Sequence, residues 1–280
     1  MNRIARAMSR APLHGVIVGL ALLWTIPTLA LFVNSFRTRQ DINASGWWNA
    51  FTDLSLTFSN YTDVLDQENM ARSFLNSVII TVPSTVFVIL VAAFAAYAFA
   101  WMRFRGRNLL FMLVVALLVV PIQATLIPVF RLLTDLNLIG EYWGLWLAHT
   151  AYGLPFAIFL LRNFFAALPR ELLESAYLDG ASDLRVFFRL LLPLSVPALA
   201  ALAIFQFMWV WNDLLVALIF LGDPDKAPMT LTISNLVGRF ASDQHLLTSA
   251  AFISMALPLL IFFALQRYFV QGILAGSVKG

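Results

Sequence analysis

The sequence contains no cysteine, which excludes both disulfide bonds and thiolate metal sites. Charged residues are also scarce, because Asp, Glu, Lys and Arg make up 12% of the 280 residues, about half the share of a typical soluble domain. The two lysines, Lys226 and Lys279, do not belong to a phosphate loop of the form G-x-x-x-x-G-K-[ST]. The chain therefore shows no nucleotide-binding loop of this class.

Metal-ligand and catalytic patterns are missing as well. His14, His149 and His245 are isolated in the sequence and lack the spacing of metal ligands, so we interpret each as an ordinary polar contact. No Ser/His/Asp set converges, which argues against a membrane enzyme. We expect no catalytic residue, no metal and no cofactor bound by this chain.

Hydrophobic residues make up 61% of the sequence, and they are gathered in long runs. A helix needs roughly 20 apolar residues to cross a bilayer core of about 30 Å. Six runs of suitable length contain no Asp, Glu, Lys or Arg: 11–36, 73–102, 108–130, 142–161, 190–212 and 244–266. The sequence therefore predicts an all-α polytopic membrane protein with six transmembrane helices.

The distribution of Lys and Arg predicts the orientation of these spans. Twelve basic residues lie in the N-terminus, the 103–107 turn, the 162–189 loop and the C-terminus, against six in the other loops. By the positive-inside rule both termini are cytoplasmic. We divide the chain into a cytoplasmic N-terminus (1–10), a transmembrane domain with a retained first helix (11–267) and a cytoplasmic tail (268–280). The outer segments are then 37–72, 134–141 and 222–246, with Trp47 and Trp48 at the membrane interface.

The loop between the fourth and fifth spans, 168–193, has the pattern of a helix-turn-helix. Pro169 suits the first turn of a helix, Glu171 and Glu174 favour its positive end, and Gly180 suits its stop. A second short amphipathic helix then runs to Pro193. By physical pattern alone, this segment would be an interfacial helix-turn-helix that lies on the lipid headgroups.

The spacing inside the 168–193 segment adds a second interpretation. Glu174-Ser175-Ala176, three residues, Gly180, nine residues and Leu190-x-Leu192-Pro193 resemble the EAA motif of ABC importer permeases. Ser175 stands where the motif has its first Ala, and Leu190 stands where it has Ile.

Further stretches resemble the carbohydrate-uptake branch of that family, in particular the shorter membrane subunit of the maltose transporter and the α-glucoside permeases. They are Asn76-Ser77, 104–107, Val120-Pro121, Asp179-Gly180-Ala181, Trp211-Asn212-Asp213 and the tail 266–280. The resemblance runs from about the first span to the last residue.

The resemblance implies an alternating-access importer of a di- or oligosaccharide or a glycoside in a bacterial inner membrane. The implied partners are a second homologous permease, two copies of a cytoplasmic ATPase that binds ATP and Mg, an extracytoplasmic sugar-binding protein and membrane lipid. Loop 222–246 would touch the binding protein, and the C-terminal tail would reach between the ATPases. The basic residues are scattered between apolar runs, so we expect no nucleic acid. The implied ATPase-coupling residues are Glu174, Ser175, Ala176, Asp179, Gly180, Leu190, Leu192 and Pro193.

A polar group after the fifth span is a candidate for the substrate pathway. Asp213 is a carboxylate in apolar surroundings and should face a partner or water. Asn212, Trp209 and Trp211 could join it in a sugar-facing patch, and Gln123 is a weaker candidate. The alternative is that Asp213 makes a structural hydrogen bond near the outer interface and that Gln123 bonds a neighbouring helix.

A self-sufficient secondary transporter is the alternative function. It would need several ionisable residues within the membrane for ion coupling, and Asp213 alone is too few. Such transporters also show inverted repeats, which this sequence does not.

Overall fold

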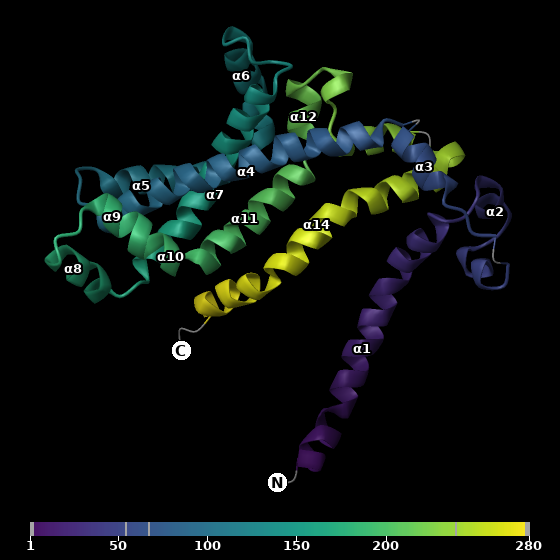
Figure 1. Ribbon diagram of the computed structural model, residues 1–280, viewed down its shortest axis with the longest axis horizontal. Coiled ribbons are helices and arrows are strands. Elements are labelled where there is room, and N and C mark those ends of the chain that lie inside the picture. The colour runs from purple at the N-terminus through teal and green to yellow at the C-terminus, as the bar shows by residue number, and fades with distance from the viewer. Residues whose placement is uncertain (1–2, 54, 67, 239, 278–280) are drawn as a thin grey trace. The chain divides into compact units, whose positions relative to one another are not determined.

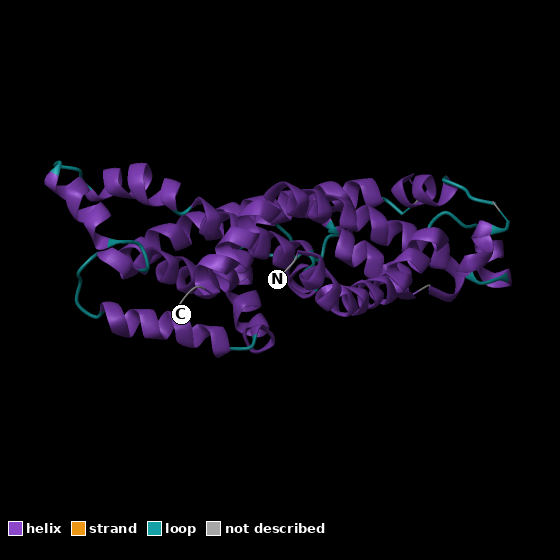
Figure 2. Ribbon diagram, turned by 90° about the horizontal axis from the view of Figure 1, so that it is seen from below, coloured by secondary structure: helices purple, strands orange, loops and turns teal. Residues whose placement is uncertain are grey.

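A computed structural model of the chain describes residues 3–53, 55–66, 68–238 and 240–277. Figure 2 shows that the regular elements of this part are helices. Residues Arg37 and Leu56 form an isolated antiparallel bridge. The predicted all-α class is thereby confirmed. The chain forms two compact units, Met1–Ala71 with Ile233–Met255 and Arg72–Thr232 with Ala256–Gly280.

The first unit begins with the long helix α1 (Arg3–Asn34), whose side chains from Pro12 onward are largely exposed although most are apolar. The predicted outer segment 37–72 then folds into helical pieces. These pieces are α2 (Arg39–Ala44), η1 (Trp47–Phe51) and α3 (Ser59–Asp66). Trp48 is 62% exposed in this unit, which leaves it free to reach a membrane interface.

A buried arginine holds this outer segment together. The side chain of Arg37 is 3% exposed and donates to the Asp41 carbonyl at 2.8 Å and to the Ser45 hydroxyl at 2.6 Å. Asn60 is buried too and donates to the carbonyls of Ser35 and Arg37 at 3.0 and 2.8 Å. Because buried polar groups are costly unless they are bonded, these contacts specify one compact arrangement for residues that the sequence marked only as a loop.

The second unit contains most of the remaining helices, and two helices are shared between the units. Its own elements are α5 (Arg107–Ala116), η2 (Leu117–Val119), α6 (Ile122–Asp135), α7 (Tyr142–Ala166), α8 (Arg170–Leu178), α9 (Asp183–Val186), η3 (Phe187–Leu191), α10 (Leu192–Leu194), α11 (Val196–Trp211), α12 (Leu215–Phe220) and η4 (Pro224–Lys226), together with nearly all of α4 (Met70–Trp101). The shared helices are α13 (Met229–Gly238) and α14 (Phe240–Ser277), and α14 is kinked at Asp243. Of the predicted C-terminal tail, 278–280 lie outside the described residues, as do 1–2 of the N-terminus.

The described residues contain four continuous helices of spanning length and two bent helix pairs, which make six spans when each pair is counted as one. Four helices are long and apolar enough to cross a membrane, at Pro12–Asn34, Met70–Trp101, Tyr142–Ala166 and Asp243–Gln266. Two bent pairs supply the others: α5 and η2 meet α6 at 106°, and Asp183–Leu194 meets α11 at 75°. The predicted count of six is consistent with this arrangement, and the runs 108–130 and 190–212 each contain a bend.

Prolines explain both breaks. Val120 precedes Pro121 and is extended, with φ −75° and ψ 117°, because a residue before proline is pushed out of the helical region. In the other pair, Pro197 lacks the N–H that would bond the carbonyl of Pro193 four residues earlier. The chain bends at Ser195 between them.

Small side chains allow the helices of the second unit to pack closely. Fully or nearly fully buried alanines from α4, α7 and α11 share one cluster with larger apolar residues: Ala92, Ala96, Ala157, Ala198, Phe165, Phe187, Leu191 and Leu202. In lipid, close packing between small residues takes over part of the role that hydrophobic burial has in water. This cluster also includes Phe187 and Leu191, which come from the 168–193 segment, so it anchors that segment to the spans.

The two ends of the second unit hold the residues that the sequence assigned to opposite sides of the membrane. At one end Arg72 pairs with Asp225 and Lys226 pairs with Glu141, each at 2.9 Å. These ion pairs join residues from the three segments that the sequence assigns to the outer side of the membrane. At the other end the turn from α4 into α5 and α8 line one cavity, and Figure 1 draws α8 and α9 at this end. The same partition of segments follows from the charges in the sequence.

Candidate functional site

The first helix of the 168–193 segment is α8 (Arg170–Leu178), and it stops where the sequence predicts. Gly180 has a left-handed backbone with φ +76°. Its N–H bonds the Tyr177 carbonyl at 3.0 Å, and the N–H of Ala181 bonds the Ala176 carbonyl at 3.0 Å. This pair of bonds is the Schellman arrangement. It suits glycine, because glycine has no Cβ and so avoids the steric cost of a left-handed backbone. Gly180 thus sets the direction in which the chain leaves α8.

The side chains of α8 divide into a buried side and an exposed side. Leu173 is 2% exposed and Ala176 is half-buried, while Glu174 and Ser175 are exposed. Ser175 bonds back to the Leu172 carbonyl at 3.0 Å, so its hydroxyl is satisfied within the helix. The polar face that the periodicity predicts is therefore available to a partner.

Beyond Gly180 a second helical stretch, Asp183–Leu194, follows where the sequence predicts one. It consists of α9, the π-helical turn η3 and α10 without a break between them. Leu190 lies in η3 and is half-buried, Leu192 begins α10 and packs against the core, and Pro193 is exposed. Leu190 and Leu192 therefore join the segment to the bundle, whereas Asp179 and Pro193 lie at its surface.

A chain of hydroxyl groups ties α8 to the second span. The Tyr177 hydroxyl donates to Asp183 Oδ1 at 2.8 Å and lies 3.0 Å from the hydroxyl of the buried Tyr97 in α4. Burial raises the pKa of the Tyr177 phenol, so this hydroxyl stays protonated and remains a donor. The helical period places Tyr177 four residues after the buried Leu173, on the apolar face of α8. Its polar role could not be inferred from the sequence because Tyr97 is 80 residues away in the chain.

Exposed apolar side chains in the same segment were also missed. Leu178 is 89% exposed, Leu184 63% and Phe188 54%. Leu178 and Leu184 flank the Gly180 turn in the sequence, and Leu178 lies one helical turn after the exposed Glu174. A surface of large apolar side chains rimmed by polar ones is typical of a protein interface. The amphipathic pattern could have pointed to it, since Leu178 follows Glu174 by four residues and is therefore an apolar side chain on the polar face of α8.

The candidate pathway residues do not form one patch. Trp211 is 4% exposed and packs on Phe74 and Phe207, with ring centroids 5.6 and 5.4 Å away. Asn212 is exposed and bonds back to the Met208 carbonyl at 2.7 Å, and Gln123 is exposed on α6. Trp209 lies edge-on to His149 at 5.9 Å. In this structure Trp211 therefore offers no free ring face to a sugar.

Asp213 makes hydrogen bonds that stabilise the local fold. Its Oδ2 accepts from the N–H groups of Val216 and Ala217 at 3.0 and 3.2 Å, which caps the start of α12. Its own carbonyl accepts from the Thr230 hydroxyl at 2.7 Å. His149 Nε2 lies 3.9 Å from the same carboxylate, beside a cavity of about 10 Å³ that has room for no more than a water. These contacts favour the structural alternative, and the pathway role of Asp213 stays a prediction.

The two roles of Asp213 are separated by a pair of variants. Asp213→Ala removes the cap and is expected to lower stability by about 1 kcal/mol, while Asp213→Asn keeps an acceptor and is expected to stay near wild type. Thermal unfolding of the detergent-solubilised protein measures this, and substrate uptake is measured in parallel. If Asp213→Asn is as stable as wild type but transports poorly, the carboxylate acts in the pathway and not as a cap alone.

Metal and cofactor sites are not evident in the part of the chain that the structure describes. No group of three or more His, Asp or Glu side chains is gathered there in a way that could hold a metal ion. What the arrangement can do is mechanical: a short helix with an exposed polar and apolar surface is fastened by hydrogen bonds to a membrane span.

Comparison with known proteins adds a family match. The family described as "Binding-protein-dependent transport system inner membrane component" matches residues 88–275. The osmoprotective compounds uptake permease protein GgtD of Synechocystis sp. is 56% identical over 283 residues, which cover 99% of this chain and 95% of GgtD. The alpha-glucoside transport system permease protein AglG of Rhizobium meliloti is 54% identical over 240 residues, which cover 84% of this chain and 63% of AglG.

A solved structure shares the fold. It is a chain of a bacterial ABC transporter involved in the import of the acidic polysaccharide alginate, and it superposes with a TM-score of 0.79. The match covers 96% of this chain and 99% of that chain at 23% sequence identity.

Proposed function

Because this chain belongs to the family of binding-protein-dependent transport system inner membrane components, we propose that it translocates a di- or oligosaccharide or a glycoside. One relative supports this substrate class, since AglG is named for α-glucoside transport. GgtD is named for the uptake of osmoprotective compounds. The chain is a permease subunit, a transport component of the inner membrane. Its ATP and Mg would be bound by two copies of a partner ATPase on the cytoplasmic side.

The observation that carries the coupling proposal is the construction of the 168–193 segment. Glu174 and Leu178 are exposed on α8 and can enter a cleft on another protein, while Tyr177 fastens the same helix to Tyr97 of α4. A force applied to the exposed surface is thus transmitted to a membrane span. In our proposal the ATPase receives α8, and its closure on ATP moves the bundle between outward-open and inward-open states.

The remaining partners follow from the same proposal. A second homologous permease would complete the translocation path, and an extracytoplasmic sugar-binding protein would deliver the substrate to the outer segments. Loop 222–246, which contains η4 and α13, is the candidate contact for the binding protein. The C-terminal tail would reach between the two ATPases.

The proposal is tested by purification and reconstitution. The chain should bring an ATPase with it from native membranes, and uptake by the reconstituted complex should require both ATP and the binding protein. Uptake by the chain alone, driven by an ion gradient and without an ATPase, would instead establish a secondary transporter.

The proposed orientation is tested with introduced cysteines, since the chain has none of its own. Ser59 and Arg105 are both exposed and lie in segments assigned to opposite sides. We expect a membrane-impermeant maleimide to label Ser59→Cys in intact spheroplasts and Arg105→Cys only in inverted vesicles. The reverse pattern would place the termini outside and contradict the charge argument.

A further inference from the structure

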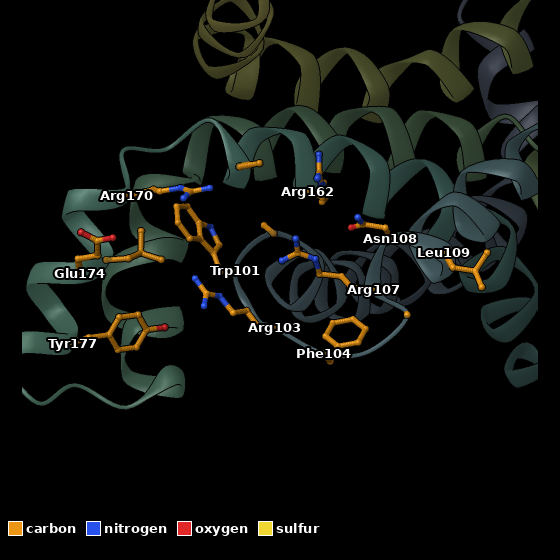
Figure 3. A pocket seen from close by; sticks show the side chains of 14 residues that line it. Trp101, Arg103, Phe104, Arg107, Asn108, Leu109, Arg162, Arg170, Glu174 and Tyr177 are labelled. Atoms are coloured by element: carbon orange, nitrogen blue, oxygen red, sulfur yellow. The ribbon is translucent and has the colours of Figure 1, made fainter.

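A cavity of about 810 Å³ opens beside α8 and is lined on that side by Leu173, Glu174 and Tyr177. Figure 3 shows its walls: the end of α4 with Trp101, the turn into α5 with Arg103, the end of α7 with Arg162, and α8 with Tyr177. Arg103 extends from its turn toward α8 (Figure 3). The cavity therefore lies where three membrane helices end and the 168–193 segment begins.

The lining of this arginine cavity is strongly positive. Four arginines line it, and the one acidic residue in the lining is Glu174. The four are Arg103, Arg107, Arg162 and Arg170. None of them forms an ion pair with another described residue of the chain. Guanidinium groups that share one concave site repel each other unless an anion neutralises them, so the cavity is built for a negatively charged occupant.

Two buried N–H donors on residues that line the cavity have no hydrogen-bond acceptor. Trp101 Nε1 and Arg162 Nε are buried and have no hydrogen-bond partner. Arg162 is fixed by a bond from Nη1 to Asn163 Oδ1 at 3.2 Å and by stacking 4.8 Å over the ring of Phe111. Arg107 is fixed by a bond from Nη1 to the Met102 carbonyl at 3.0 Å. Pre-positioned guanidinium forks and an indole N–H match the several acceptor oxygens of a phosphate group.

The apolar rim points to the source of that phosphate. Leu109 lines the cavity and is 58% exposed, Phe104 lines it and is 42% exposed, and Leu110 next to them is 48% exposed. A soluble phosphate compound would gain nothing from these side chains, whereas an acyl chain can lie along them. Basic pockets between the ends of membrane helices are the usual sites for anionic lipid headgroups.

We propose that the arginine cavity binds the phosphate headgroup of an anionic phospholipid, with its acyl chains along the exposed face of α5. The proposal depends on the membrane location of the family and not on the coupling role of α8. Its consequence is that α8 would pack partly against lipid, because Glu174 and Tyr177 line the same cavity.

The experiment compares two arginines in one turn. Arg103 lines the cavity and Arg105 does not, although both are exposed and neither has a described partner. The protein, purified with its partner subunits, is placed in nanodiscs of phosphatidylcholine and phosphatidylglycerol, and retained lipid is measured by native mass spectrometry. Arg103→Gln is expected to lower retained phosphatidylglycerol by about tenfold, since one charge-assisted contact is lost, while Arg105→Gln retains the wild-type amount.

Other outcomes overturn the proposal. Equal retention in the two variants would show that the cavity does not select the lipid. Displacement of phosphatidylglycerol by millimolar inorganic phosphate would identify a soluble phosphate as the occupant. Loss of the ATPase from Arg103→Gln with unchanged lipid would assign the cavity to the ATPase instead. Failure of the proposed transport function would appear separately, as a wild-type chain that purifies without an ATPase.

Discussion

Gly180→Val is expected to lower docking of the partner ATPase by about tenfold or more, the effect of losing one or two interface hot spots, and uptake should fall with it. The left-handed backbone at Gly180, with φ +76°, would cost a valine about 1–2 kcal/mol. A Cβ built there meets nothing within 4 Å, so the protein would not be unfolded by a clash. The strain would instead redirect the chain after α8 and tilt the surface that carries Glu174.

Gly222→Val is the matched control for this prediction. Gly222 also has a left-handed backbone, with φ +63°, and also has open space around a Cβ. It lies in the segment assigned to the outer side, so the same strain should leave ATPase co-purification unchanged. Gly180→Asn, whose side chain tolerates the left-handed region, should be milder than valine. Normal docking and uptake in Gly180→Val would remove the coupling role and return the 168–193 segment to an interfacial helix on lipid.

Gly144→Ala is expected to have the largest effect on folding and assembly. Gly144 is buried in the first turn of α7, and a Cβ there would collide with the Leu138 carbonyl oxygen of the preceding turn. Because the colliding atom belongs to the backbone, no change of rotamer relieves it, and overpacking of this kind costs about 1–3 kcal/mol. Less of the chain should appear in the assembled complex, as measured by fluorescence-detected gel filtration.

Two other helical glycines complete this series. A Cβ at Gly153 meets the side-chain amide of Gln206, with Oε1 at 2.7 Å, and that flexible group can move. A Cβ at Gly15 in α1 meets nothing within 4 Å. We expect Gly15→Ala to assemble at least as well as wild type, because Ala favours helix over Gly, and Gly153→Ala to be intermediate. Equal assembly of all three variants would contradict the packing argument.

The number of spans and the end of α8 were predictable because each depends on local chemistry. Charge-free runs mark the spans, and Gly180 marks a helix stop whether or not the rest of the protein is known. The bends were not predicted, although Pro121 and Pro197 stand at the positions where they occur. Membrane helices often tolerate proline, so the bend at each site depends on what the neighbouring helices can satisfy.

The contacts that fasten the candidate site were beyond sequence reasoning. A hydrogen bond joins Tyr97 and Tyr177 from distant parts of the chain. Arg103 and Arg162 are also far apart in the sequence, yet both line one cavity. Asp213 was recognised as unusual from its apolar surroundings, but its capping role depends on the turn into α12, which the sequence did not reveal. Composition identifies which residues are unusual, and tertiary structure decides what each one contacts.

The broken third span has a consequence for biogenesis. Its first half comprises the 10 residues of α5 and the 3 of η2, and its second half the 14 residues of α6. Each half is about 20 Å long, which is well short of the roughly 30 Å hydrocarbon core. Neither half is therefore a good substrate for the insertion machinery by itself. Both contact α7, so we expect this part of the chain to settle in the bilayer only after α7 has been synthesised and can receive it.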